Sequence, residues 1–282
     1  MNRSLFVTDL DGTLFNDDRA ISERDLDTLA RLRSKGVVVA VATGRSIYSF
    51  HKALAHMDLE KERLPVDYLL FSTGAGILDL KQDRIVRHLA ILRPDVEKIC
   101  TCFGEAGCDY MVHKAIPETH FFLYRSHGHE NPDFHKRIGL YQSFATPLQA
   151  DTLLYASATQ VLAIVPHGLS PDQVTEWKSV LAGYSVIHAT SPLDHRSAWI
   201  EVFHPKASKS QAAAWLAARF QIPRTRVVAV GNDFNDQDLL EWAGQSFCVA
   251  NTVPGMNTGF LLPVSNNADG VTQAAAMSGL LD

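Results

Sequence analysis

Residues 6–14 read FVTDLDGTL, and this run combines a strand pattern with two closely spaced acids. The apolar character of Leu5–Thr8 indicates a short buried strand. Asp9 and Asp11 stand where that strand ends, and Gly12 allows the chain to turn tightly beyond it. In open parallel sheets, ligands bind at the carboxyl ends of the strands. We therefore expect both carboxylates to turn toward one ligand.

Helical and strand-like patterns alternate on both sides of this run. Residues 22–36 combine an N-cap serine, apolar residues at helical spacing and a closing glycine. Residues 37–42 are a continuous apolar run, as expected for a central parallel strand covered on both faces. A helical pattern at 208–220 and an apolar run at 227–230 repeat the alternation. The sequence therefore predicts an α/β fold, with a Rossmann-like parallel-sheet core and helices on both faces.

The pattern changes in the middle of the chain. Strand-like runs near 108–113, 120–124 and 161–165 mix there with helical runs near 94–106 and 171–181. We expect an inserted α+β cap domain at 81–190. The catalytic core would then consist of 1–80 and 191–282, and would resume with a strand at 199–203.

Composition and charge limit the classes of function. Hydrophobic residues make up 46% and charged residues 20%, so the chain should fold throughout. The formal net charge of -5 disfavours a nucleic acid partner, and no apolar run is long enough to span a membrane. Asp9 comes too early for a signal peptide, so a cytoplasmic location is expected. The cysteines lack paired zinc-ligand spacing and are expected to be reduced, buried thiols (Cys100, Cys102, Cys108 and Cys248).

Three more polar clusters follow the first one at predicted core elements. They are Thr43-Gly44-Arg45, a lysine-rich segment at 206–209, and residues 231–236, which read GNDFND. In this order, the four clusters resemble the motifs of the haloacid dehalogenase superfamily of phosphotransferases, whose first motif is D-x-D-x-[TV]. The Thr-Gly-Arg form of the second motif and the place of the insertion are similar to the Cof-type branch, which includes sugar-phosphate phosphatases.

The resemblance implies a role for each motif residue. Asp9 would attack phosphorus, and Asp11 would serve as general acid and base. Thr43 would bind a phosphoryl oxygen, and Lys209 would offset negative charge, with Lys206 as a possible substitute. The implied substrate-binding residues are Thr43, Gly44, Arg45, Lys209, Asn235 and, in the insertion, Arg125.

The resemblance also implies a Mg²⁺ cofactor, which prefers oxygen ligands. Its implied ligands are Asp9, Asp11 through its backbone carbonyl, Asn232, Asp233 and Asp236. One position departs from the family, because the usual fourth motif, G-D-x-x-N-D, has an aspartate where this chain has Asn232. Either the Asn232 carbonyl or the Asp233 carboxylate could be the ligand.

These signals together predict a Mg²⁺-dependent phosphatase that acts on a small phosphorylated metabolite, a sugar phosphate, through an aspartyl-phosphate intermediate. A phosphomutase or phosphotransferase on the same scaffold is an alternative, and a non-catalytic phosphometabolite sensor is a weaker one. The insertion is expected to cover the active site and choose the substrate, with candidate contacts at His113, His120, Arg125, His127 and His129. We expect a monomer or homodimer.

Overall fold

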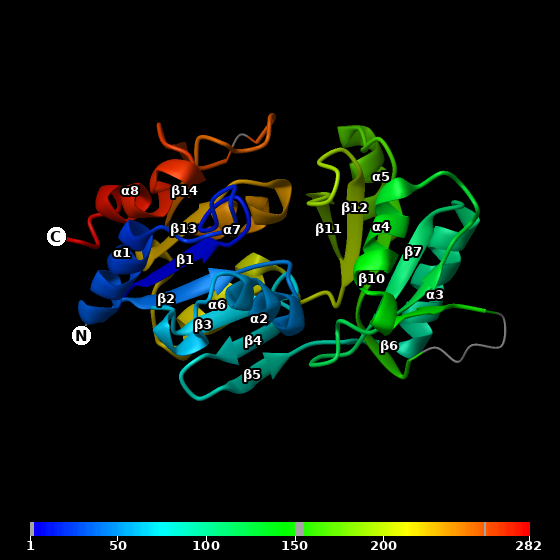
Figure 1. Ribbon diagram of the computed structural model, residues 1–282, viewed down its shortest axis with the longest axis horizontal. Coiled ribbons are helices and arrows are strands. Elements are labelled where there is room, and N and C mark those ends of the chain that lie inside the picture. The colour runs from blue at the N-terminus through cyan, green and yellow to red at the C-terminus, as the bar shows by residue number, and fades with distance from the viewer. Residues whose placement is uncertain (1–2, 150–154, 257) are drawn as a thin grey trace. The chain divides into compact units, whose positions relative to one another are not determined.

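The chain is divided into two compact units. The computed structural model describes residues 3–149, 155–256 and 258–282. The first unit comprises Met1–His88 and Ser208–Asp282, and the second comprises Leu89–Ala207 (Figure 1). Both ends of the chain therefore belong to the first unit, and the second is an insertion.

The first unit is built on an eight-stranded sheet in the order β15-β14-β13-β1-β2-β3-β4-β5. Its strands are parallel from β15 to β3. Strand β4 runs antiparallel to β3, and the edge strand β5 runs antiparallel to β4. The strands are β1 (Leu5–Asp9), β2 (Val38–Ala42), β3 (Tyr68–Phe71), β4 (Gly76–Asp79), β5 (Arg84–His88), β13 (Val227–Gly231), β14 (Gln245–Cys248) and β15 (Phe260–Leu261).

Helices cover this sheet because its central strands are apolar on both faces. Leu5 and Val7 of β1 pack in a cluster with side chains of α6 and α7. Phe6, between them, points to the opposite face of the sheet and is also fully buried. The helices are α1 (Glu23–Ser34), α2 (Ile47–His56), α6 (Lys209–Arg219), α7 (Gln237–Trp242) and α8 (Gly270–Met277). Short 3₁₀ turns are η1 (Lys61–Arg63), η3 (Arg224–Arg226), η4 (Phe234–Asp236) and η5 (Asn266–Ala268). The expected α/β core is confirmed.

The second unit is an α+β insertion on a mainly antiparallel sheet in the order β11-β12-β10-β7-β8-β9, with β6 paired to β10. Helices α3 and α5 pack on one face of the sheet and α4 packs on the other. Its strands are β6 (Ile91–Leu92), β7 (Asp109–Lys114), β8 (Phe122–Arg125), β9 (Ala145–Pro147), β10 (Ser157–Val165), β11 (Ser185–Thr190) and β12 (Ala198–Phe203). Its helices are α3 (Arg93–Glu105), α4 (Pro132–Leu140) and α5 (Pro171–Val180), with a 3₁₀ turn η2 (Gln142–Phe144).

The insertion lies later in the chain than the sequence predicted, at Leu89–Ala207 rather than 81–190. The expected core strand at 199–203 is β12, which pairs with β10 and β11 in the second unit. At the other boundary, β5 extends the first sheet beyond residue 80. A buried apolar run predicts a strand but does not say which sheet it joins, and this explains the error at β12. Strand β5 is only partly buried and was not predicted as a strand.

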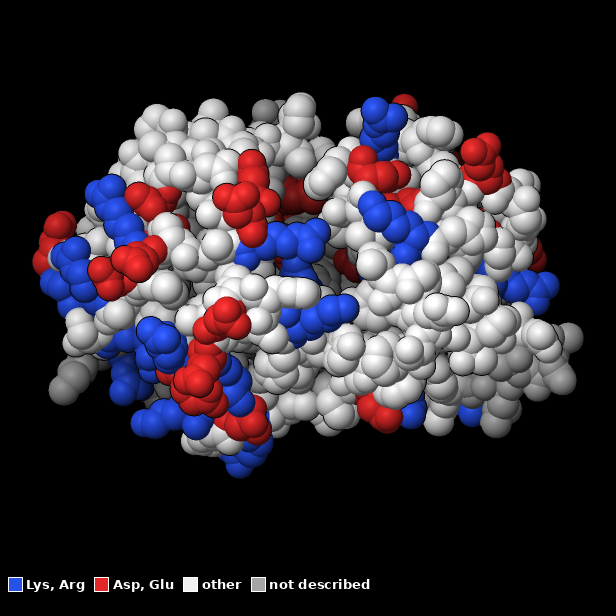
Figure 2. Space-filling view, viewed as in Figure 1, with Lys and Arg blue, Asp and Glu red and all other residues white. Residues whose placement is uncertain are grey.

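The charged side chains on the surface are of both signs (Figure 2). On the face seen in Figure 2, acidic and basic side chains are interspersed, without the continuous basic surface that binds a phosphate backbone. Among the residues that the structure describes, no helix is both long and apolar enough to cross a bilayer.

Candidate active site

The sequence motifs of the first unit meet at one edge of its sheet. Strand β1 lies in the middle of that sheet, between β2 and β13 (Figure 1). Asp9 is the last residue of β1, Thr43 directly follows β2, and Gly231 ends β13. Because these strands are parallel, their carboxyl ends lie side by side.

Lys209 is the centre of a buried polar assembly. Its Nζ donates to Asp9 Oδ1 at 2.6 Å, to Asn235 Oδ1 at 3.1 Å and to Asp236 Oδ1. Lys209 and Asp236 are fully buried, and Asp9 is 5% exposed. Ser208 caps the start of α6 and thereby fixes the first residue of that helix, Lys209. The contact with Asp9 joins residues 200 positions apart in the sequence, and the other two join α6 to the turn after β13.

The charges in this assembly do not balance. Burial alone lowers the pKa of Lys209, but Asp236 and Asp9 outweigh it and raise the pKa above its ordinary value, so the ammonium stays charged. Burial, and next the charge of Asp236, raise the pKa of Asp9 to about 8, although Lys209 acts in the opposite direction. One ammonium group serves two buried carboxylates, so one negative charge lacks compensation when both are ionised, and this imbalance disfavours ionisation of Asp9.

Asp11 is held by Arg45 through both of its oxygens. Arg45 Nη2 donates to Asp11 Oδ1 at 2.5 Å, and Nε donates to Oδ2 at 2.7 Å. The remaining guanidinium nitrogen donates to Ser49 Oγ at 3.2 Å. A bidentate pair of this kind fixes direction as well as distance. The Asp11 side chain is nevertheless 43% exposed, so it has room to turn.

Thr43 and the turn after β3 lie at the same edge of the sheet. Thr43 is 1% exposed, and its Oγ1 accepts a hydrogen bond from Arg45 N at 3.1 Å. The Thr43 hydroxyl therefore has its hydrogen left to donate. Gly74 has a positive φ of 83°, and a Cβ there would stand 2.2 Å from the Ser208 carbonyl oxygen. Glycine at this turn lets it approach the start of α6.

The fourth motif lies against the first. Thr13 Oγ1 donates to Asn232 Oδ1 at 3.0 Å, and a Cβ on Gly12 would stand 2.6 Å from Asn232 Nδ2. The backbone carbonyl of Asn232 accepts from Thr252 Oγ1 and from Val253 N, both at 2.9 Å. Asn232 is therefore fixed beside the loop that carries Asp11.

The carboxylates of Asp233 and Asp236 are engaged in the turn that follows β13. Asp233 Oδ1 accepts from Phe234 N at 2.7 Å. Asp236 Oδ2 accepts from the backbone of Asn232 at 2.9 Å and of Asp233 at 3.1 Å, while its Oδ1 faces Lys209. Both oxygens of Asp236 are thus used in holding the turn and the lysine, which differs from the predicted role as a metal ligand. The N–H groups at the start of a helical turn need such an acceptor.

Two other predicted residues belong to the second unit. Lys206 is exposed and belongs to the second unit, so Lys209 is the lysine that contacts Asp9. Arg125 is exposed at the end of β8, also in the second unit. Gly44, between Thr43 and Arg45, is in the first unit as expected. Sequence reasoning missed Asn251, whose Nδ2 donates to the Gly12 carbonyl at 2.8 Å. Its only sequence signal was its place in a segment after the fourth motif.

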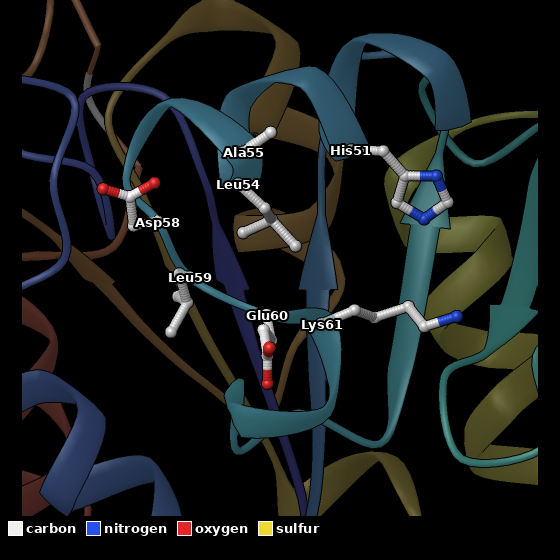
Figure 3. Close-up of a pocket in the computed structure, with 7 residues that line it drawn as sticks. All are labelled: His51, Leu54, Ala55, Asp58, Leu59, Glu60 and Lys61. Carbon is white, nitrogen blue, oxygen red and sulfur yellow. The ribbon is translucent and has the colours of Figure 1, made fainter.

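A hollow on the first unit is separate from these residues. It has a volume of about 560 Å³ and is lined by α2 and the segment after it: His51, Leu54, Ala55, Asp58, Leu59, Glu60 and Lys61 (Figure 3). Two of its side chains are acidic, and Lys61 is paired with Asp83 at 2.7 Å. These charges are unsuited to a phosphate ester.

Within the described ranges, no group of three or more His, Cys, Asp or Glu side chains is arranged to hold a metal ion.

The motifs and the fold agree with comparisons to known proteins. The family model for haloacid dehalogenase-like hydrolases matches residues 6–274. The chain belongs to this family. A 5-amino-6-(5-phospho-D-ribitylamino)uracil phosphatase of Bacillus subtilis is 27% identical to it over 275 residues, which cover 95% of each chain.

Solved structures of haloacid dehalogenase phosphatases share the fold. One, from Bacteroides thetaiotaomicron, has a TM-score of 0.76 at 17% identity and covers 98% of this chain and 95% of its own. A sugar phosphatase of subclass IIB has a TM-score of 0.74 at 15% identity and covers 98% of this chain and 99% of its own. The expected family and the expected class of enzyme, a phosphatase, are confirmed.

Proposed function

We propose that this haloacid dehalogenase-like hydrolase is a Mg²⁺-dependent phosphatase that forms an aspartyl-phosphate at Asp9 and acts on a phosphorylated sugar or polyol. The observation that carries the proposal is the buried assembly of Asp9, Lys209 and Asp236 at the carboxyl end of the central strand. A nucleophile held by a buried cation is preorganised to react with an anionic phosphoryl group.

The chain's own residues account for each chemical step. A carboxylate oxygen of Asp9 forms a bond to phosphorus, and the bond from phosphorus to the ester oxygen breaks. Asp11 turns away from Arg45, takes up a proton from solvent and gives it to the departing ester oxygen. Water then attacks the same phosphorus, Asp11 takes back a proton, and phosphate and the free Asp9 carboxylate are released. Arg45 acts by positioning Asp11, and Thr43 binds a phosphoryl oxygen through its hydroxyl hydrogen.

The donors at the site fit Mg²⁺. The uncompensated negative charge favours a cation, and oxygen donors are available from the Asp9 carboxylate, the Asp11 carbonyl and the Asn232 side chain. When bound, Mg²⁺ offsets the repulsion between the attacking carboxylate and the phosphoryl group. We assign the fourth-motif ligand to Asn232 rather than Asp233, because Asn232 lies against the Gly12–Thr13 loop. Asp236 holds Lys209 and is not part of this set.

The substrate class rests on similar proteins. The Bacillus subtilis relative is named for a substrate with a phosphorylated ribityl chain, and a structural neighbour is a sugar phosphatase. We propose a small phosphorylated metabolite of this kind, selected by the second unit. A cytoplasmic enzyme, active as a monomer or homodimer, is consistent with its four free cysteines.

A panel of phosphorylated metabolites assayed for phosphate release, with and without Mg²⁺, tests this function. We expect release that EDTA abolishes and that Mg²⁺ restores, and a covalent phosphate on Asp9 when turnover is stopped by acid. A phosphate that moves to another hydroxyl without being released would identify a mutase. Binding without any turnover would identify a sensor.

A further inference from the structure

The loop that carries Asp11 is held by side chains from the C-terminal part of the first unit. This loop, residues 10–17, directly follows β1, and we call it the Asp11 loop. Three asparagines contact it from two turns: Asn251 after β14, and Asn266 and Asn267 in η5. All of these residues belong to the first unit. We call the three asparagines the asparagine clamp.

Asn251 uses both ends of its amide group. Its Nδ2 donates to the Gly12 carbonyl at 2.8 Å, and its Oδ1 accepts from Asn266 N at 3.0 Å. Gly12 has a positive φ of 76°, so the chain turns sharply at the residue that follows Asp11. The hydrogen bond from Asn251 therefore holds the turn that sets the direction of Asp11.

Asn266 and Asn267 hold the far end of the Asp11 loop. Asn266 is 3% exposed, and its Nδ2 donates to the Phe15 carbonyl at 3.0 Å and to Asp17 Oδ1 at 3.1 Å. Asn267 Nδ2 donates to Asp17 Oδ2 at 2.9 Å, and its Oδ1 accepts from Asp17 N at 3.0 Å. The hydrogen bonds from Asn267 first, and then from Asn266, lower the pKa of Asp17, so it accepts them as a carboxylate near pH 7.

The segment that begins at Asn251 also holds the fourth motif. Thr252 Oγ1 and Val253 N both donate to the backbone carbonyl of Asn232 at 2.9 Å. On its other side, Asn232 accepts from Thr13 in the Asp11 loop through its side-chain oxygen, at 3.0 Å. One short segment therefore joins the two loops that carry Asp11 and Asn232.

The position of Asp11 depends on the backbone of this loop. Its side chain is 43% exposed, so packing does not fix it. In the proposed mechanism Asp11 turns away from Arg45, and the loop then has to bring its carboxyl group within about 3 Å of the departing oxygen. A displacement of about 1 Å at a reacting group can cost about 10²-fold in rate.

We infer that Asn251 and Asn266 are positioning residues that hold the Asp11 loop for proton transfer to the leaving group. The inference rests on the proposed phosphatase function and adds residues that act on the reaction through Asp11. It predicts that loss of the asparagine clamp harms a substrate in proportion to its need for an acid.

Two aryl phosphates with different leaving groups test the inference. 4-Nitrophenolate departs without much protonation, whereas the more basic phenolate needs a proton, so the ratio of kcat/KM for 4-nitrophenyl phosphate to that for phenyl phosphate measures dependence on the acid. We expect this ratio to rise about threefold in Asn251→Ala. In Asn266→Ala it should rise about tenfold, because the lost side chain is buried and makes two hydrogen bonds. The matched control, the exposed amide variant Gln245→Ala, should keep the wild-type ratio.

A second background shows whether the clamp acts through Asp11. In Asp11→Asn, which has no acid to position, adding Asn251→Ala should leave the ratio unchanged. Equal losses of kcat/KM for both aryl phosphates in Asn251→Ala and Asn266→Ala, with the wild-type ratio kept, would make the clamp purely structural and overturn the inference. A further rise of the ratio in the Asp11→Asn background would overturn it as well.

Hydrogen–deuterium exchange of residues 10–17 needs no turnover and tests the contact itself. We expect faster exchange there in Asn251→Ala and Asn266→Ala than in Gln245→Ala, and exchange at the wild-type rate would reject the clamp. If the wild type hydrolyses neither aryl phosphate, the proposed function fails and the role in proton transfer fails with it. Hydrolysis with an unchanged ratio in the clamp variants instead rejects this inference alone.

Discussion

The Lys209 assembly in the first unit and a polar row in the second (His113, Gln160 and Glu201) both bury ionisable side chains, but they differ in how far their hydrogen bonds are satisfied. The Lys209 ammonium has three oxygen partners, whereas His113 Nε2 has no hydrogen-bond partner within the described part of the chain. A satisfied network is rigid and suits a chemical group that every substrate shares. A buried acceptor without a partner lowers the stability of the fold instead. The comparison therefore predicts larger effects for substitutions in the Lys209 assembly than for substitutions in the polar row.

The largest expected effect concerns the nucleophile of the Lys209 assembly. Asp9→Asn removes the attacking carboxylate but keeps the size of the side chain, so kcat for an aryl phosphate should fall by at least about 10³-fold. Steady-state phosphate release measures this loss, and the exposed Asp18→Asn is the control. Substantial activity in a folded Asp9→Asn protein would contradict covalent catalysis.

The next effect is on stability. Lys209→Met leaves the buried carboxylates of Asp9 and Asp236 without their shared cation, and the free energy of unfolding should fall by about 3–5 kcal/mol. Urea denaturation monitored by circular dichroism gives the value. Adding Asp236→Asn to Lys209→Met should recover part of the loss, because one unpaired charge is removed. If Lys209→Met costs no more than the exposed Lys52→Met, the assembly is not a network.

The sequence predicted the Lys209 assembly better than the polar row, for a physical reason. The carboxyl ends of parallel strands meet at one edge, so Asp9, Thr43 and the fourth motif could be brought together from their order alone. The choice of Lys209 over Lys206, and the use of both Asp236 oxygens within the turn, needed coordinates.

No comparable rule locates functional residues in the antiparallel sheet of the second unit. His113 was a candidate among five residues, but Gln160 and Glu201 were not considered, since their neighbours come from antiparallel strands whose pairing the sequence does not state. The boundary error at β12 had the same origin and assigned Glu201 to the wrong unit. A lone polar residue in an apolar strand, such as Gln160 or Glu201, was the signal that could have located the polar row.

A smaller effect concerns the fourth-motif residue that binds Mg²⁺ in the first unit. If Asn232 is the metal ligand, Asn232→Asp adds a negative charge to the donor set and should lower the Mg²⁺ concentration for half activity by about tenfold. Asn232→Ala should raise that concentration, and Asp233→Asn should change it little. Mg²⁺ titrations of the three variants measure these shifts. A large loss in Asp233→Asn with no change in Asn232→Ala would assign the ligand to Asp233.

The smallest expected effect is a pH dependence of stability that originates in the polar row. The folded-state pKa of His113 is lowered to about 3 by burial and then by Arg137, against the hydrogen bond that its ring donates to the Thr119 carbonyl, which acts in the opposite direction. Because the unfolded chain has a histidine pKa of about 6.5, it binds a proton first as the pH falls, and the folded state loses stability below that value. The loss should reach about 1 kcal/mol near pH 6 and continue toward pH 3.

His113→Asn keeps a donor for the Thr119 carbonyl but cannot titrate, so urea denaturation at pH 7.5 and pH 5.5 should show a shallower pH dependence for this variant than for the wild type. The exposed His129→Asn is the control and should retain the wild-type slope. Equal slopes for all three proteins would contradict a lowered pKa of His113 in the folded state.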